Sequence, residues 1–355
     1  MAHASPVPTE RLLVVLPSWV GDVVMATPTL RALRGLYPAV RITYLAKKAV
    51  RPVIDAAPWY DRMIADRSSG GGRSGGLLSL ATRLRSGRFD MAVLLPNSFR
   101  TALLARLAGI PRRVGYARDG RAWLLTDRLT PLREDGRFKP ISAVDYYLEI
   151  ARHLGADDPG PTLELHTHPQ DDEAADAMLR RRGVDGSKPL VLLNPGASYG
   201  DAKMWYPDRF AAVADQLAES HDARILLNGS PKERAILDRV KAAARTPMLD
   251  LPRAGGNLRL LKSVVKRCSL MITNDTGPRH FAVAFDVPVV TIFGPTDPRW
   301  SESDFPRERK VMVDVFCGPC QKKQCPLDHR CMTRIGPDMV YDWAAELLAS
   351  QPRQA

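Results

Sequence analysis

One stretch of the chain, Ser269-Leu-Met-Ile-Thr-Asn-Asp-Thr-Gly-Pro-Arg-His-Phe-Ala-Val-Ala-Phe-Asp286, has the pattern of a strand, a turn and a helix in succession. Its apolar run Leu270-Met-Ile272 predicts a buried strand, and Val289-Val-Thr-Ile-Phe293 predicts the strand after the helix. Between them, Asn274-Asp-Thr-Gly277 supplies residue types that cap helices and tolerate tight turns. Such a turn directs free backbone N–H groups and the positive end of a helix above the sheet. We therefore expect an anion here, and a diphosphate would suit the turn.

The same alternation extends over the rest of the chain. Upstream of this stretch it predicts strands over 190–193, 224–227 and 249–251, separated by helices over 172–182, 207–219, 231–244 and 258–267. In the N-terminal half it predicts strands over 11–17, 41–45, 62–66 and 89–96, with helices between them and Asn97 as the cap of the helix that ends at 107. Pro28 is expected to kink or restart the first helix. Two successive runs of β-α-β units indicate an α/β fold with two doubly wound domains.

The domain boundary is expected where the periodicity stops. Residues 156–170 are rich in Pro, Asp, Thr and His and read as a linker. We place the first domain at 1–160, the second at 161–335, and a C-terminal helix within 336–355 that should pack back toward the first domain. A ligand site is expected in the cleft between the domains, because the carboxyl ends of parallel strands carry the sites of such folds.

The composition favours a globular enzyme. The 355 residues are 45% hydrophobic and 25% charged, with no apolar run long enough to span a membrane. The polar N-terminal ten residues do not resemble a signal peptide, so a cytoplasmic protein is expected. The net charge of +12 suits nucleic acid, anionic lipid or phosphorylated ligands. We expect no nucleic acid, because no binding motif or aromatic stacking platform accompanies the basic residues.

Two segments of the first domain each allow two interpretations. The glycine-rich segment 68–76 is either a flexible loop, which we favour, or a functional lid. The predominantly basic segment 100–139 is either a solvated face or a surface for a phosphorylated or membrane-bound acceptor.

Four predicted strand ends of the second domain carry turn chemistry: 194–198, 228–230, 274–277 and 293–297. One such turn is weak support for a site, because turns use these residue types anyway. Four at one sheet edge predict a nucleotide or nucleotide-sugar site. The glycine spacing of dinucleotide-binding folds is absent, which weighs against NAD.

Several polar residues near these turns have both a functional and a structural interpretation. Lys203 could neutralise a departing diphosphate, or be an ordinary surface lysine. Glu233 could accept ribose hydroxyls, or complete a capping box with Ser230. Asp275 and His280 could contact a ligand, or serve as a cap and a structural histidine.

In the first domain, Asp22 is the sole carboxylate between Leu12 and Leu36 and follows the first strand. It could accept a proton from an attacking hydroxyl, or cap the helix.

The cysteines Cys317, Cys320, Cys325 and Cys331 form a compact cluster, with His329 nearby. Four thiolates, or three with the histidine, could hold a structural zinc ion, although the spacing matches no standard zinc ribbon or knuckle. Free thiols are equally compatible with the pattern, and a disulfide is disfavoured in a reducing cytoplasm.

Together these motifs resemble glycosyltransferase family 9, the bacterial lipopolysaccharide heptosyltransferases, and in particular its heptosyltransferase II branch. The similarity spans almost the whole chain and is carried by Leu16-Pro-Ser-Trp-Val-Gly-Asp22, Asn194-Pro-Gly-Ala197, Lys203-Met-Trp205, Gly229-Ser-Pro-Lys-Glu233, Thr273-Asn-Asp-Thr-Gly-Pro-Arg-His280, Phe293-Gly-Pro-Thr296 and the cysteine segment. Pro278-Arg279 stands where the family more commonly has a pair that contains Leu or Met.

The resemblance implies a GT-B fold and an inverting transfer that requires no metal or other cofactor. The donor would be ADP-L-glycero-β-D-manno-heptose, and the acceptor a lipid-linked lipopolysaccharide core sugar reached from the anionic inner-membrane surface. Asp22 would be the general base and Lys203 would steady the diphosphate. The implied donor-binding residues are Gly196, Ser198, Ser230, Glu233 at the ribose, Asp275 at the heptose, and Thr276, Gly277 and His280 at the phosphates.

Two other functions are compatible with the sequence. A relative within the family could move a different nucleotide-activated sugar to another glycan or protein, and a panel of donors would separate the two. A non-catalytic anion- or nucleic-acid-binding protein would explain the positive charge. It would leave Asp22 and the four turns at one edge without a role.

Overall fold

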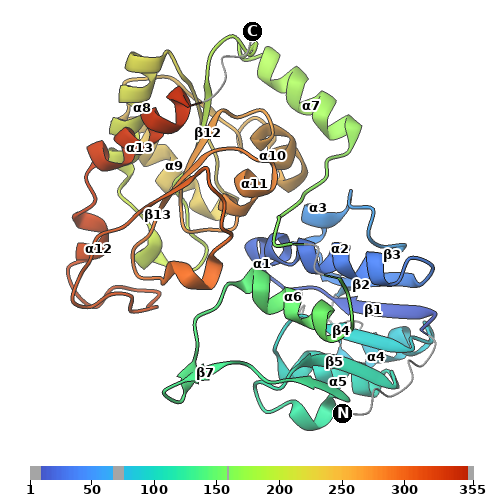
Figure 1. Cartoon of the computed structure of the whole chain (residues 1–355). Coiled ribbons are helices and arrows are strands. Elements are labelled where there is room, and N and C mark those ends of the chain that lie inside the picture. Colours follow the sequence, from blue (N-terminus) through green and yellow to red (C-terminus); the bar gives the residue numbers. More distant parts are fainter. Residues whose placement is uncertain (1–8, 67–75, 158–159, 351–355) are drawn as a thin grey trace. The chain divides into compact units, whose positions relative to one another are not determined.

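The computed structural model describes residues 9–66, 76–157 and 160–350. The chain divides into two compact units: the N-terminal unit (1–163 and 300–302) and the C-terminal unit (164–299 and 303–355), each with its own sheet (Figure 1). The division after residue 163 lies close to the expected boundary at 160. The glycine-rich segment, apart from Gly76, and most of the polar N-terminus lie outside the described residues.

The sheet of the N-terminal unit has the strand order β3-β2-β1-β4-β5-β6, and all its neighbouring strands are parallel. Its strands are β1 (Arg11–Val15), β2 (Arg41–Lys47), β3 (Arg62–Asp66), β4 (Met91–Leu94), β5 (Arg112–Tyr116) and β6 (Asp127–Leu129). A separate two-stranded hairpin is formed by β7 (Arg133–Glu134) and β8 (Arg137–Phe138). The central strands β1 and β4 are almost wholly buried, as expected for a parallel sheet covered on both faces.

Helices cover both faces of this sheet (Figure 1). They are α1 (Val20–Met25), α2 (Thr27–Leu36), α3 (Arg51–Ile54), α4 (Leu77–Arg85), α5 (Phe99–Leu107) and α6 (Ala143–His153), with a 3-10 helix η2 (Ala122–Leu124). As predicted, the first helix restarts at Pro28, which lies in the first turn of α2. The predicted cap at Asn97 is wrong: Ser98 is the N-cap of α5, and its hydroxyl accepts a hydrogen bond from Thr101 N at 3.3 Å.

The C-terminal unit repeats the same strand order, as β11-β10-β9-β12-β13-β14, again with all neighbours parallel. Its strands are β9 (Leu190–Asn194), β10 (Arg224–Leu227), β11 (Met248–Asp250), β12 (Leu270–Asn274), β13 (Val289–Ile292) and β14 (Glu308–Val311). Its helices are α7 (Pro169–Arg180), α8 (Pro207–His221), α9 (Arg234–Ala243), α10 (Leu258–Val265), α11 (Arg279–Ala284), α12 (Arg330–Thr333) and α13 (Pro337–Ala349). Short 3-10 helices are η3 (Asp201–Lys203), η4 (Pro231–Glu233) and η5 (Pro298–Ser301). Two sheets of this order confirm the predicted pair of doubly wound α/β folds.

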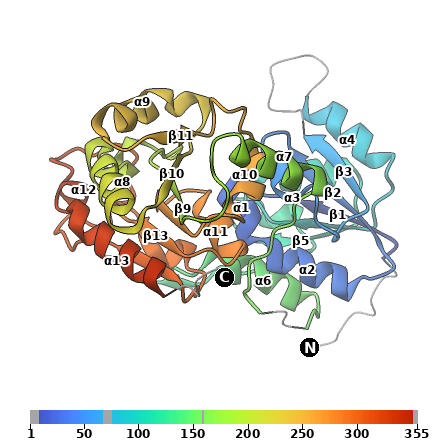
Figure 2. The same ribbon diagram turned by 90° about the horizontal axis from the view of Figure 1, so that it is seen from above.

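The C-terminal helix α13 packs within the C-terminal unit. Helix α8 lies between α9 and α13 (Figure 2). The buried face of α13, formed by Val340, Ala344 and Leu347, belongs to the same core as Phe210 and Leu217 of α8. This face of α13 is therefore buried within the C-terminal unit, and the packing of α13 toward the N-terminal domain stays a prediction.

Across the described ranges, none of the helices has the length and apolar character needed to cross a bilayer.

Candidate functional site

Three neighbouring strands of the C-terminal unit end in asparagine side chains that are hydrogen-bonded to one another or to adjacent turns. Asn228 Nδ2, after β10, donates to Asn194 Oδ1, at the end of β9, over 2.7 Å. Asn194 Nδ2 donates in turn to Thr276 Oγ1, after β12, at 3.1 Å. All three strand ends meet at the carboxyl edge, and the amides are buried. This chain of amides fixes the predicted turns relative to one another, because buried, satisfied networks are rigid.

Asn274 ties the Asn194–Ser198 turn and the Lys203 segment to β12. Its Nδ2 donates to Pro195 O at 2.7 Å, and its Oδ1 accepts from Trp205 N at 3.1 Å. The indole of Trp205, fully buried, donates to Ile335 O at 3.1 Å. The segment that carries Lys203 is therefore anchored on both sides.

Lys203 and Asp275 form an ion pair at this edge. Lys203 Nζ lies 2.5 Å from Asp275 Oδ2 and also donates to the backbone carbonyl of Asp275 at 3.1 Å. Thr296 Oγ1, after β13, donates to the same Oδ2 at 2.8 Å. The two charged side chains are 12% and 9% exposed, so Lys203 is not an ordinary surface lysine. Burial would raise the pKa of the Asp275 carboxyl, but the charges of Lys203 and Arg279 outweigh it and hold that pKa below its usual value.

His280 lies in the first turn of α11, close to this pair, and is almost fully buried. Burial, and then the charge of Arg279, lower the pKa of His280 to about 3. Its Nδ1 is buried and has no hydrogen-bond partner among the residues that the structure describes. The ring is therefore neutral near pH 7, and its contribution to anion binding is limited to donating a hydrogen bond.

The start of α11 differs from the expected row of free N–H groups. Arg279 N donates to Thr276 O at 3.1 Å, and His280 N donates to Gly277 O at 3.2 Å. The turn closes with bonds between residues three apart, which use these donors within the backbone. The prediction of free N–H groups is therefore wrong for Arg279 and His280.

Glu233 has the structural role that its spacing suggested. Ser230 N donates to Glu233 Oε2 at 2.6 Å, and the reciprocal bond completes a capping box. The same carboxylate lies against Gly196, where an added Cβ would be 2.2 Å from Glu233 Cδ. This close approach joins the turns after β9 and β10 and requires glycine at position 196. Ser198, further along the first turn, is exposed.

Asp22 of the N-terminal unit lies in the first turn of α1, just after β1, and is partly exposed. It is not the N-cap, which is Trp19. The hydroxyl of Tyr147 on α6 hydrogen-bonds to the Asp22 carboxylate. Burial, and then this negative charge, raise the pKa of Tyr147 well above its usual value, so the phenol remains a donor. The arrangement orients the carboxylate at the carboxyl edge of the first sheet.

Two residues that interact with these groups were not singled out from the sequence. Tyr147 holds Asp22, and Glu308 of β14 pairs with Arg279. No spacing connects either pair in the sequence. From the sequence, Tyr147 could be noticed only as a tyrosine in an amphipathic helix, and Glu308 only as an acidic residue at the start of an edge strand.

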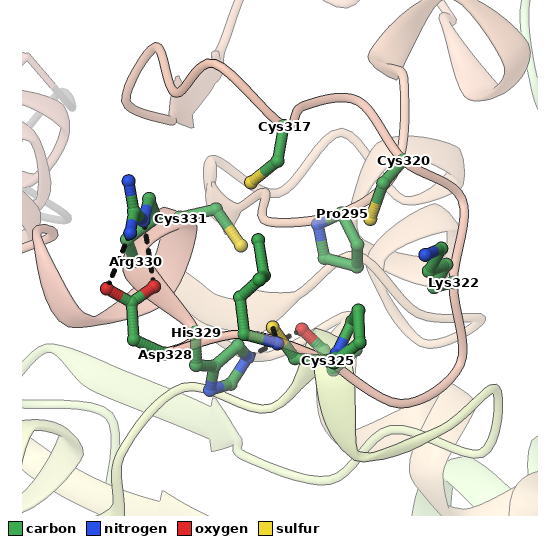
Figure 3. Close-up of a pocket in the computed structure, with 12 residues that line it drawn as sticks. Pro295, Cys317, Cys320, Lys322, Cys325, Asp328, His329, Arg330 and Cys331 are labelled. Carbon is green, nitrogen blue, oxygen red and sulfur yellow. Dashed lines mark hydrogen bonds and ion pairs between the residues drawn. The ribbon is translucent and has the colours of Figure 1, made fainter.

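The cysteine cluster lines a pocket beside the Lys203 segment (Figure 3). His329 Nε2 is 2.8 Å from Ala202 O, and Ala202 N donates to Lys323 O at 3.1 Å. Gln321 N donates to Pro295 O at 2.8 Å. The cysteine segment therefore packs against the turn 293–297 and against η3, the 3-10 helix that ends at Lys203.

The thiols of Cys317, Cys320, Cys325 and Cys331 are free. Among the described residues, no three His, Cys, Asp or Glu side chains are arranged to hold a metal ion, so the expected zinc site has no support. Burial, and then the neighbouring thiols, raise the pKa of Cys331.

Comparison with known proteins identifies the family. Residues 77–330 match the family described as glycosyltransferase family 9 (heptosyltransferase). Lipopolysaccharide heptosyltransferase 2 of Salmonella typhimurium is 31% identical over 351 residues, which are 96% of this chain and 99% of that protein.

Two solved structures have the same two-domain fold. E. coli ADP-heptose lipopolysaccharide heptosyltransferase II matches with a TM-score of 0.78 and 26% identity, over 96% of this chain and 98% of that one. A glycosyltransferase family 9 protein from Veillonella parvula matches with a TM-score of 0.82 and 23% identity, over the same shares of the two chains. The predicted GT-B fold and the family resemblance are confirmed. The chain belongs to glycosyltransferase family 9, the heptosyltransferases.

Proposed function

We propose that this protein is an inverting glycosyltransferase that moves heptose from ADP-L-glycero-β-D-manno-heptose to an inner-core sugar of lipopolysaccharide. The observation that carries the proposal is the buried Lys203–Asp275 pair at the carboxyl edge of the second sheet. A pre-positioned ammonium group there can stabilise the charge of a departing diphosphate. Family membership and the names of the similar enzymes supply the sugar and the acceptor class.

The reaction exchanges one bond at the anomeric carbon and transfers one proton. The acceptor hydroxyl oxygen bonds to the anomeric carbon of the heptose, while the bond from that carbon to the diphosphate oxygen breaks and ADP leaves with the electron pair. The hydroxyl proton passes to the Asp22 carboxylate, which Tyr147 orients. Lys203 neutralises the growing negative charge on the diphosphate. This chemistry assigns no step to a metal or other cofactor.

The other proposed contacts follow the turns of the second sheet. Beyond its bonds to Lys203, Thr296 and Arg279, the Asp275 carboxylate keeps accepting lone pairs, which suit sugar hydroxyls. Glu233 would contact the ribose through capacity not used in the capping box. The remaining proposed donor-binding residues are Gly196, Ser198, Ser230, Thr276, Gly277 and His280.

We further propose that the protein works in the cytoplasm and contacts the anionic inner-membrane surface peripherally. The support is the basic segment 100–139, whose hairpin β7–β8 exposes Arg133, Arg137 and Lys139. Sedimentation with vesicles should detect salt-sensitive binding to anionic but not to neutral lipid. Replacing the three hairpin cations with serine should weaken that binding without changing the melting temperature. Equal binding to both lipids would contradict the proposal.

A transfer assay with the purified chain tests the function. The donor is ADP-heptose, and the acceptor is lipopolysaccharide from a strain whose core stops before the added heptose. Mass spectrometry should detect one added heptose for each ADP released. A panel of other nucleotide sugars serves as the comparison. Transfer from one of those sugars, with none from ADP-heptose, would favour the alternative donor and contradict the proposal.

A further inference from the structure

A second buried charge pair lies directly behind Asp275. Arg279, in the first turn of α11, is fully buried and donates two hydrogen bonds to Glu308 of β14, at 2.6 and 2.8 Å. The side chain of Glu308 is 1% exposed and also accepts a bond from Thr291 Oγ1 at 2.5 Å. Two parallel N–H···O bonds between a guanidinium and a carboxylate are among the strongest and most directional in proteins. Arg279 is thereby held in one orientation.

From this position Arg279 reaches the Asp275 oxygen that Lys203 and Thr296 leave open. Arg279 Nη1 is 3.5 Å from Asp275 Oδ1, whereas Lys203 and Thr296 both bond to Oδ2. The Asp275 carboxylate therefore has a partner on each oxygen, and its plane is fixed from both sides.

The charges alternate along the network: Lys203 positive, Asp275 negative, Arg279 positive and Glu308 negative. The set is neutral in total, which suits its burial. Glu308 is essential to this balance. Without it, Arg279 would have Asp275 as its remaining carboxylate within this network and would compete with Lys203 for it.

We propose that Arg279 and Glu308 are positioning residues that hold the Asp275 carboxylate, and through it the Lys203 ammonium group, in the geometry required for transfer. The inference rests on the proposed function of Lys203. Neither residue touches substrate in this scheme. Their effect is on the placement of the group that stabilises the leaving diphosphate, where small displacements have large effects on rate.

The test replaces the pair together, as Arg279→Met with Glu308→Gln, so that no unpaired charge is left buried. The matched control is Arg267→Met with Asp176→Asn. It removes another bidentate arginine–carboxylate ion pair in the same unit. For each protein, kcat, the KM for ADP-heptose, the pH profile and the melting temperature are measured.

In the Arg279 and Glu308 double variant, kcat should fall about tenfold or more, with a much smaller change in KM. The groups facing Asp275 are Lys203, Arg279, His280 and the Thr296 hydroxyl. Loss of the arginine raises the pKa of Asp275, so protonation begins at a higher pH. The acid limb of the profile should therefore move to higher pH. The control should keep both the wild-type kcat and the wild-type acid limb.

An unchanged kcat and acid limb in the double variant would overturn the proposal, whatever happens to the melting temperature. If the double variant does not fold, Arg279→Lys is tested instead. It keeps the positive charge but loses the pair of parallel hydrogen bonds to Glu308. It should then lower kcat with little effect on KM, and a wild-type kcat would overturn the proposal.

Carbon-13 NMR of the carboxyl groups, with Asp275→Asn for assignment, separates this inference from the proposed function. If the wild-type protein transfers no heptose, the proposed function fails, while the positioning role is still judged from the titration of Asp275. An upward shift of the Asp275 pKa in the Arg279 and Glu308 double variant supports the role. An unchanged pKa overturns it.

Discussion

Strands β1 and β9 hold the same place in two sheets of the same strand order, yet the segments that come after these two strands differ. After β1 the chain turns into α1, whose Asp22 carboxylate is partly exposed and bonded to Tyr147 from a helix. After β9 the chain enters a turn whose Asn194 is bonded to the ends of both neighbouring strands. At the carboxyl edge of the first sheet, one hydrogen bond orients a single carboxylate. At the same edge of the second sheet, hydrogen bonds connect several turns to one another.

The buried arginines of the two units differ in the same way. Arg121 of the N-terminal unit is fully buried and donates to Tyr116 O at 3.0 Å, to Pro96 O and to Thr101 Oγ1 at 3.2 Å. Its hydrogen-bond partners in the described part of the chain are neutral, and burial lowers its pKa to about 10. Arg279 of the C-terminal unit instead contacts two carboxylates.

The contrast indicates a division of labour on one architecture. A rigid, charge-balanced edge suits the fixed binding of a nucleotide sugar, because its groups need no reorganisation when charge develops. An edge with a partly exposed carboxylate suits proton transfer from the hydroxyl of an acceptor. Under the proposed function, the C-terminal unit binds the donor and the N-terminal unit supplies the base.

The largest expected effect is at Asp22. Asp22→Asn keeps the size of the side chain and its contact with Tyr147, but removes the proton acceptor. We expect kcat to fall by about 10²–10⁴-fold, with the melting temperature close to that of the wild type. Steady-state transfer assays and calorimetry measure both. A variant with near-normal kcat would remove Asp22 from the mechanism and with it the contrast between the two edges.

Lys203→Met should have the next largest effect. It removes the ammonium group and leaves Asp275 with Arg279 and Thr296 as partners. We expect kcat to fall by about 10²–10³-fold, because one stabilising donor to a developing anion is lost. Lys188→Met, which breaks an exposed pair with Asp222, is the control and should behave as the wild type. Equal activities of the two variants would contradict the assignment.

Gly196→Ala tests the rigidity of the second edge. The added Cβ would collide with the Glu233 carboxyl group, so the turns after β9 and β10 must separate. We expect a loss of about 1–3 kcal/mol in the free energy of unfolding of the C-terminal unit, measured by denaturant titration. Gly255→Ala, at a position with open space around it and a φ of +89°, compares the effect of backbone strain alone. If Gly196→Ala has the wild-type free energy of unfolding, the turns after β9 and β10 can separate without cost, and the edge is not rigid.

The smallest effect is expected from Tyr147→Phe. It removes the hydrogen bond to Asp22 and leaves the ring in its buried site on α6. We expect kcat to fall about tenfold, since a hydrogen bond to a charged group contributes about 1.5 kcal/mol. The melting temperature is measured alongside. If kcat stays at the wild-type value, Asp22 does not need this partner for its orientation.

Much of the architecture follows from local sequence. The apolar runs of the central strands, such as Leu190–Asn194, and the restart at Pro28 were predicted because periodicity and proline act over a few residues. Strands β5, β6 and β14 were not predicted. Their sequences, RRVGY, DRL and ERKV, contain no continuous apolar run, so they gain strand structure from pairing with a formed sheet rather than from their own pattern.

The candidate site was only partly predictable for the same reason. Turn residues such as Asn194 and Asp275 were found because strand ends collect at one edge of a parallel sheet. The pairing of Arg279 with Glu308 spans 29 residues and the pairing of Asp22 with Tyr147 links two helices, so no spacing rule reports either. The backbone N–H groups at the start of α11 were expected to be free. In this six-residue helix they instead donate to carbonyl oxygens three residues earlier.

The most direct test of the division between the two edges is the affinity for ADP-heptose of two variants, measured by isothermal titration calorimetry. The account predicts that Asp22→Asn binds the donor as tightly as the wild type although its kcat is strongly reduced. It predicts that Lys203→Met binds the donor more weakly. A loss of donor affinity in Asp22→Asn, or an unchanged affinity in Lys203→Met, would contradict the account.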